Sequence, residues 1–84
     1  PLPPQAWIKA LGPRIRHVHL HNNYGKNDDH NGLLDGSLDY LPILEALEEH
    51  CPEANWNLEL RNGHEASIDL VMGFLAASGY SENL

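Results

Sequence analysis

The chain has 84 residues and a formal net charge of −7 at pH 7, and its five Lys and Arg residues form no cluster. Because phosphate binding requires concentrated basic side chains, this balance argues against a nucleic-acid partner. A single cysteine, Cys51, excludes an internal disulfide, and no apolar run approaches the roughly 20 residues needed to cross a bilayer. We therefore expect a soluble, cytoplasmic protein without a membrane segment.

The first predicted elements are a short helix and a strand. Apolar residues recur at helical spacing over Gln5–Leu11, and the following Gly12-Pro13 is a typical helix stop. The apolar positions of this helix are Ala6, Trp7, Ala10 and Leu11. The next segment, Ile15–His21, alternates between a largely aliphatic face and a face of three imidazoles, which predicts a strand. These imidazoles belong to His17, His19 and His21.

A long polar segment and a second helix follow. The segment Asn22–Ser37 is rich in Asn, Asp and Gly, and a loop of this length in a compact domain is usually functional. Asp39 is predicted to cap a helix that runs to about His50, with Pro42 in its first turn, where the missing N–H is harmless. The predicted apolar stripe of this helix is Tyr40, Ile43, Leu44 and Leu47.

The last predicted elements are a second strand and a final helix. Over Trp56–Leu60, apolar residues alternate with Asn57 and Glu59, so this strand also has one polar face. The final helix is predicted from an apolar stripe that ends near Ser78-Gly79. The stripe consists of Ile68, Val71, Met72 and Leu75. Strands separated by helices favour parallel pairing, so we expect an α/β unit.

A doubly wound sheet and a βα barrel both fit this order of elements. Strands of a doubly wound sheet are apolar on both faces, whereas each strand here has a polar face that a barrel could direct into its mouth. Active sites of such barrels lie at the C-terminal ends of the strands, where His19, His21 and Glu59 fall. A complete barrel needs about 250 residues, so residues 1–84 are expected to form a single partial domain.

Four polar residues from the two strands and the long loop form a candidate metal site. His19, Asp28, His30 and Glu59 offer imidazole and carboxylate ligands suited to Zn, Mn or Co, and they can converge if the two strands are neighbours. Glu59 is the best single candidate, because a carboxylate between apolar strand residues needs a cation or a partner. A salt bridge would explain Glu59 equally well.

Four segments resemble the C-terminal signature of the xylose-isomerase-like barrels, a superfamily of sugar isomerases, epimerases and AP endonucleases. They are Arg16–Gly25, Asp28–His30, Asp35–Tyr40 and Asn57–Leu60, and together they extend over most of the chain. The resemblance implies that the chain is the C-terminal quarter of a (β/α)8 TIM barrel, comprising its last two βα units. A divalent metal, Zn, Mn, Co or Mg, would be the cofactor.

The resemblance also implies individual roles. In that superfamily the second histidine of His-x-His on the seventh strand is a metal ligand, which corresponds to His19. The glutamate ending the eighth strand, here Glu59, also ligates metal and, in the epimerase branch, acts as the catalytic acid or base. In the AP endonuclease branch an Asp-x-His pair, here Asp28 and His30, binds zinc.

This sequence departs from the family pattern at two positions. Asn22 stands where an aspartate is usual, and Leu34-Asp35-Gly36 replaces a Gly-x-Gly before the helix. The remaining metal ligands are expected from earlier strands, before Pro1. The chain alone is therefore expected to be inactive.

Three functions are consistent with the sequence. The first is a sugar or sugar-phosphate isomerase/epimerase, in which metal polarises the substrate while a glutamate moves a proton. The second is an AP-endonuclease-like zinc phosphodiesterase, supported by Asp28 and His30 but opposed by the acidic charge. The third is a non-catalytic truncated product that self-associates through exposed sheet edges. We therefore expect either a homo-oligomer or a missing N-terminal barrel segment.

Overall fold

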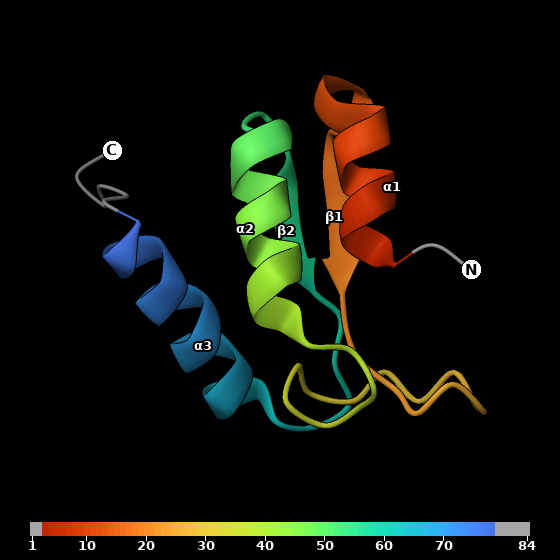
Figure 1. Cartoon of the computed structure of the whole chain (residues 1–84). Helices are drawn as coiled ribbons and strands as arrows, with labels where there is room; N and C mark the ends of the chain where they lie inside the picture. Colours follow the sequence, from red (N-terminus) through yellow and green to blue (C-terminus); the bar gives the residue numbers. More distant parts are fainter. Residues whose placement is uncertain (1–2, 79–84) are drawn as a thin grey trace.

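The computed structural model describes residues 3–78. Helices and strands alternate along this part of the chain, with a single-turn 3-10 helix after the first helix (Figure 1). In chain order the elements are α1 (Pro4–Leu11), η1 (Gly12–Arg14), β1 (His17–Leu20), α2 (Tyr40–His50), β2 (Asn55–Leu58) and α3 (His64–Ala77). This order agrees with the predicted one.

The two strands pair in parallel, as predicted. The register aligns His17 with Asn55 and Leu20 with Leu58. Both strands are shorter than predicted, because the parallel ladder comprises only four residue pairs, of which these are the first and the last. His21 and Leu60, which were predicted to end the two strands, lie beyond the paired residues. They belong to the irregular segments that follow β1 and β2.

The two faces of this sheet differ sharply. Helices α1 and α2 lie over one face, and α3 lies to the side of α2 (Figure 1). Val18 and Leu20 of β1 point toward these helices and are at least partly buried. The opposite face carries only exposed polar side chains from the strands: His17, His19, Asn55 and Asn57. The predicted alternation is therefore confirmed, with a helix-covered face and a bare polar face.

Helix α1 ends where predicted, but its buried face is different. Gly12 adopts a positive φ of 51° and terminates the helix. Trp7 and Leu11, predicted members of its apolar stripe, are 55% and 44% exposed, whereas Ile8 is buried. The predicted apolar positions therefore do not define the buried face of α1, whose one buried residue, Ile8, belongs to the hydrophobic core.

Helix α2 supplies most of the hydrophobic core. The Asp39 side chain accepts a hydrogen bond from the Leu41 backbone N–H, which confirms the predicted cap. All four residues of the predicted stripe are buried: Tyr40, Ile43, Leu44 and Leu47. Leu33 from the preceding loop joins them with 1% exposure, so the long loop is anchored in the same core.

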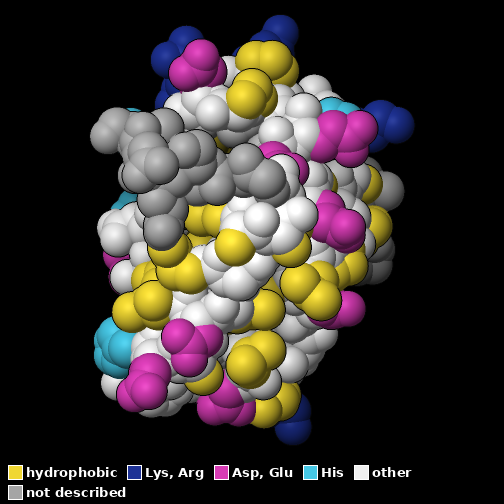
Figure 2. Space-filling view, turned by 90° about the vertical axis from the view of Figure 1, so that its left-hand side faces the viewer, with side chains coloured by type: hydrophobic (Ala, Val, Ile, Leu, Met, Phe, Trp, Pro, Cys, Tyr) yellow, Lys and Arg dark blue, Asp and Glu magenta, His cyan; other side chains and the backbone are white. Residues whose placement is uncertain are grey.

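Helix α3 is packed less completely. It begins directly after Gly63, whose φ of 66° is the left-handed conformation that glycine adopts easily. Ile68 and Met72 of the predicted stripe are 49% and 42% exposed, so that part of the prediction was wrong. Figure 2 faces the α3 side and shows hydrophobic side chains exposed among carboxylates. The predicted stop at Ser78-Gly79 extends beyond the described residues.

The long loop Asn22–Ser37 is irregular, as predicted, but it is braced by specific bonds. An antiparallel bridge joins Asn22 to Asn31, through N–H to carbonyl bonds of 3.0 and 2.8 Å. The loop also bonds to the start of α3, where the Ser67 hydroxyl accepts from the Leu33 N–H at 2.9 Å. The loop therefore connects the end of β1 to both later helices.

Within residues 3–78, no helix has the length and hydrophobicity that a membrane span requires. Two parallel strands covered by helices on one face are compatible with two βα units of a barrel wall. A fragment of a doubly wound sheet would have the same pairing, so the barrel remains a prediction.

Candidate functional site

The site lies at the C-terminal ends of the two parallel strands. His19 is in β1, and Glu59 follows the last residue of β2 directly. The Glu59 backbone N–H donates to the Leu20 carbonyl at 3.1 Å, which continues the ladder by one bond. Because the strands are parallel neighbours, their ends place His19 and Glu59 side by side.

The four predicted site residues form a row in which imidazoles and carboxylates alternate. His19 Nδ1 lies 3.0 Å from Glu59 Oε2. The other oxygen of Glu59, Oε1, lies 3.3 Å from His30 Nδ1. The opposite nitrogen of His30, Nε2, lies 3.0 Å from Asp28 Oδ1. The structure thus brings all four together pairwise, but Asp28 contacts only the far side of the His30 ring.

The backbone of His30 is held in an unusual conformation. Its φ of 52° is the only positive φ of a non-glycine residue among residues 3–78. The His30 carbonyl accepts from the Arg61 N–H at 2.8 Å, and its Nδ1 lies 3.1 Å from the Glu59 carbonyl. Left-handed backbone at a non-glycine residue costs about 1–3 kcal/mol and tends to occur at functional sites. The segment after β2 therefore positions His30.

The charge state of His30 follows from these contacts. Its bond to the Glu59 carbonyl, assisted by the Asp28 carboxylate, raises the pKa of His30 above its usual value, while desolvation opposes the rise. In the protonated form both ring nitrogens donate, one toward Glu59 and one toward Asp28. Metal binding by this ring requires the neutral form, so a cation would compete with a proton here.

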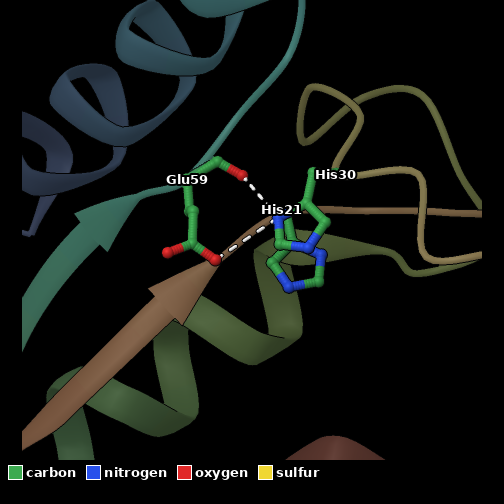
Figure 3. A group of neighbouring side chains, drawn as sticks. All are labelled: His21, His30 and Glu59. Atoms are coloured by element: carbon green, nitrogen blue, oxygen red, sulfur yellow. Dashed lines mark hydrogen bonds and ion pairs between the residues drawn. The ribbon is translucent and has the colours of Figure 1, made fainter.

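One member of the cluster, His21, was not among the predicted ligands. One potential ligand atom each of His21, His30 and Glu59 lies within 4.8 Å of the others. The rings of His21 and His30 stack with centroids 4.0 Å apart and planes inclined by 20° (Figure 3). The strand alternation did place His21 on the face of His19, and that signal could have identified it.

Asn22, which departs from the family pattern, organises the loop beneath the site. Its Nδ2 donates to the carbonyls of Leu33 and Leu38, each at 2.9 Å. Its Oδ1 accepts from the N–H groups of Asn23 and Leu38. An ionised aspartate could not donate to the two carbonyls, which gives a physical reason for the amide here.

Gly36 is required by the same arrangement. A Cβ at position 36 would lie 2.1 Å from Asn22 Oδ1, so only glycine allows the loop to pass this close. One residue earlier, the Asp35 carboxylate accepts a hydrogen bond from the exposed Tyr24 hydroxyl. That bond raises the pKa of Tyr24 above its ordinary value. Both contacts tie the start of the loop to its end.

A small cavity of about 210 Å³ adjoins the cluster. Its lining residues are His30, Glu59, Leu60 and Arg61. The cavity therefore combines a carboxylate, an imidazole and a residue with a cationic side chain. Nitrogen and oxygen donors of this kind suit a divalent transition metal, and the Glu59 carboxylate can also accept a proton.

Comparisons with known proteins show one distant similarity. The chain is 30% identical over 59 residues to the Uncharacterized protein MJ1311 of Methanocaldococcus jannaschii. The matched region covers 70% of this chain and 20% of that protein, so the chain spans about a fifth of its curated relative. No protein-family model and no solved structure matches the chain.

Proposed function

We propose that this chain is the metal-binding C-terminal quarter of a divalent-metal-dependent sugar or sugar-phosphate isomerase/epimerase with a (β/α)8 barrel. The observation that carries the proposal is the row of His19, Glu59, His30 and Asp28 at the adjacent ends of two parallel strands. Strand ends are where barrel enzymes place their ligands.

These four side chains would hold the metal. Imidazole and carboxylate donors fit Zn, Mn or Co, whereas Mg prefers an oxygen-rich shell and fits less well. When bound, the metal would supply polarisation of the substrate carbonyl and adjacent hydroxyl. The further ligands are proposed to come from earlier strands of the same barrel.

Glu59 is proposed as the proton carrier. Its carboxylate is about half exposed, lies beside the cavity, and faces a histidine with each oxygen. A substrate bound in the cavity could present the carbon next to its carbonyl to this group. The carboxylate would take the proton from one carbon and return it to the neighbouring carbon or to the opposite face.

The test compares Glu59→Gln with His17→Ala in the full-length protein, using turnover of ketoses and ketose phosphates. His17 is also an exposed β1 residue on the bare face, but it forms none of the cluster contacts. Glu59→Gln should lower turnover by at least about 100-fold, the usual scale of general acid-base catalysis, whereas His17→Ala should change it little. Equal losses in both variants would contradict the assignment.

A second test uses the 84-residue chain itself. Because most of the pocket and the other ligands are expected outside it, the isolated chain should show no isomerase activity. Ketose turnover by the isolated chain would refute the proposal that it is a barrel quarter.

The second candidate function is an AP-endonuclease-like zinc phosphodiesterase. The observation that favours it is the contact between Asp28 and His30, the pair that the resemblance assigns to zinc in that branch. The net charge of −7 opposes it, since this segment offers no basic surface for DNA. Cleavage of a duplex with an abasic site, abolished by His30→Ala and without ketose turnover, would establish this alternative.

A further inference from the structure

His21 is fixed in place by Tyr40, which lies outside the row of predicted ligands, and by His30, which belongs to it. Its backbone carbonyl accepts a 2.5 Å hydrogen bond from the hydroxyl of Tyr40, a buried residue that begins α2. Its ring lies against the ring of His30 in a parallel stack. Both the main chain and the side chain of His21 therefore have defined positions before any ligand binds.

One nitrogen of this ring lacks a partner. Among the described residues, the Nδ1 atom of His21 is the only buried side-chain nitrogen or oxygen without a hydrogen bond. Leaving such a group unsatisfied costs about 1–3 kcal/mol, and its presence in a folded protein calls for an explanation. A metal ion is one partner that can satisfy the lone pair of a neutral imidazole.

The surroundings of the ring point to the same explanation. Figure 3 shows the Glu59 carboxylate and the ring of His30 beside His21, with ligand atoms of the three residues within 4.8 Å of one another. Atoms grouped this closely can reach one common ion. The second nitrogen of His30 is bonded to Asp28, the kind of contact by which a carboxylate orients a ligating histidine.

We propose that His21 is a metal ligand that acts together with His30 and Glu59, and that Asp28 positions His30. The inference rests on the proposed metal-dependent function and revises its ligand set: His21, which the resemblance does not assign, becomes a ligand, and Asp28 acts through His30. Two imidazoles and one carboxylate of this cluster would then bind the ion, while His19 contacts the Oε2 atom of Glu59. Such a nitrogen-rich set favours Zn or Co over Mg and leaves room for a substrate oxygen.

The experiment measures Co²⁺ binding to the metal-depleted full-length protein by its visible d–d absorption. His21→Phe is the decisive variant, because it keeps an aromatic ring stacked against the ring of His30 but removes both nitrogen atoms of residue 21. His17→Phe is the matched control on the same strand face. His21→Phe should weaken Co²⁺ binding by at least about tenfold and alter the spectrum, whereas His17→Phe should leave both unchanged.

The stability of the metal-free protein distinguishes a ligand from a structural residue. Since the Nδ1 atom makes no hydrogen bond, His21→Phe should unfold in urea at the same or a higher concentration than the wild type. If this variant fails to fold, the ¹⁵N shifts of the His21 ring in the wild type decide instead. Those shifts should change when Zn²⁺ is added.

The outcomes separate the two proposals. If the wild type binds no Co²⁺, the proposed metal-dependent function is overturned together with this inference. If the wild type binds Co²⁺ and His21→Phe binds it equally well with the same spectrum, only the role of His21 is overturned. Unchanged ¹⁵N shifts of His21 in a Zn²⁺-loaded wild type would also overturn that role.

Discussion

Helices α2 and α3 follow the two strands of the same small sheet, yet they are packed very differently. Helix α2 buries five residues, whereas α3 buries only Ser67. A cavity of about 410 Å³ lies between the end of α2, the start of β2 and the later part of α3. The α2 region therefore has a core of its own within residues 3–78, and α3 leaves apolar surface uncovered.

The difference explains why the predicted apolar face was confirmed in full for α2 but only in part for α3. The α2 stripe meets the sheet, α1 and Leu33, so every apolar residue in it finds a partner. In α3, Val71 and Phe74 pack against the core, while Ile68 and Met72 face outward. If the proposed barrel is correct, other strands and helices would cover this outward face.

The largest expected effect comes from the α2 core. Leu44 has 0% exposure, so Leu44→Ala should lower the free energy of unfolding by about 2–5 kcal/mol through lost burial and a new cavity. Met72→Ala on the outward side of α3 should change it by less than about 0.5 kcal/mol. Urea denaturation measures both. Equal losses would mean that the surface around Met72 is covered in solution.

The loop that joins the two regions gives the second prediction. Asn22→Asp should lower the free energy of unfolding at pH 7 by about 1–3 kcal/mol, because the Leu33 and Leu38 carbonyls lose their donor. Acidification should restore part of the loss, since a protonated carboxyl can donate to one carbonyl. The folded-state pKa of the new carboxyl is thus expected to be raised.

Asn23→Asp serves as the control for that change. The Asn23 side chain accepts a bond from the Gly25 N–H, and an aspartate can accept it equally well. The two variants add the same charge at adjacent positions. Similar losses in both would show that charge, rather than the missing donor, destabilises Asn22→Asp.

The third prediction concerns the attachment of α3 to the loop. The Ser67 hydroxyl accepts from the Leu33 N–H and donates to the Gly63 carbonyl. Ser67→Ala leaves the Leu33 N–H without a partner and should lower the free energy of unfolding by about 1–2 kcal/mol. Ser37→Ala, at an exposed loop residue, should have little effect on the denaturation midpoint. Hydrogen exchange at the Leu33 amide should become faster only in Ser67→Ala.

Local sequence patterns were sufficient for several of these features. Asp39 was identified as a cap from its place before an apolar stripe, because capping depends on residues within one helical turn. The approach of His19 to Glu59 followed from strand periodicity and parallel pairing, since the ends of parallel neighbours must meet. The contact between His19 and Glu59 could therefore be predicted without any information about the structure of the loop.

Other features depend on contacts between distant residues and left little trace in local patterns. The positive φ of His30 is maintained by bonds to Glu59 and Arg61, about thirty positions away in the sequence. The partners of Asn22 lie across the whole loop. The exposed members of the predicted stripes of α1 and α3 have the same origin, because helical spacing reveals an apolar stripe but not which neighbour covers it.

The smallest expected effect is a difference in thiol reactivity at the boundary between the two regions. Cys51 is 2% exposed at the end of α2 and also lines the cavity toward α3. Burial raises the pKa of its thiol above the ordinary value of 9.0, so little reactive thiolate is present at neutral pH. Alkylation should be slow in the folded protein, with a pH midpoint above 9.0, and faster in urea. A midpoint at or below 9.0 would show that water reaches the sulfur through the cavity, and that the packed core ends before Cys51.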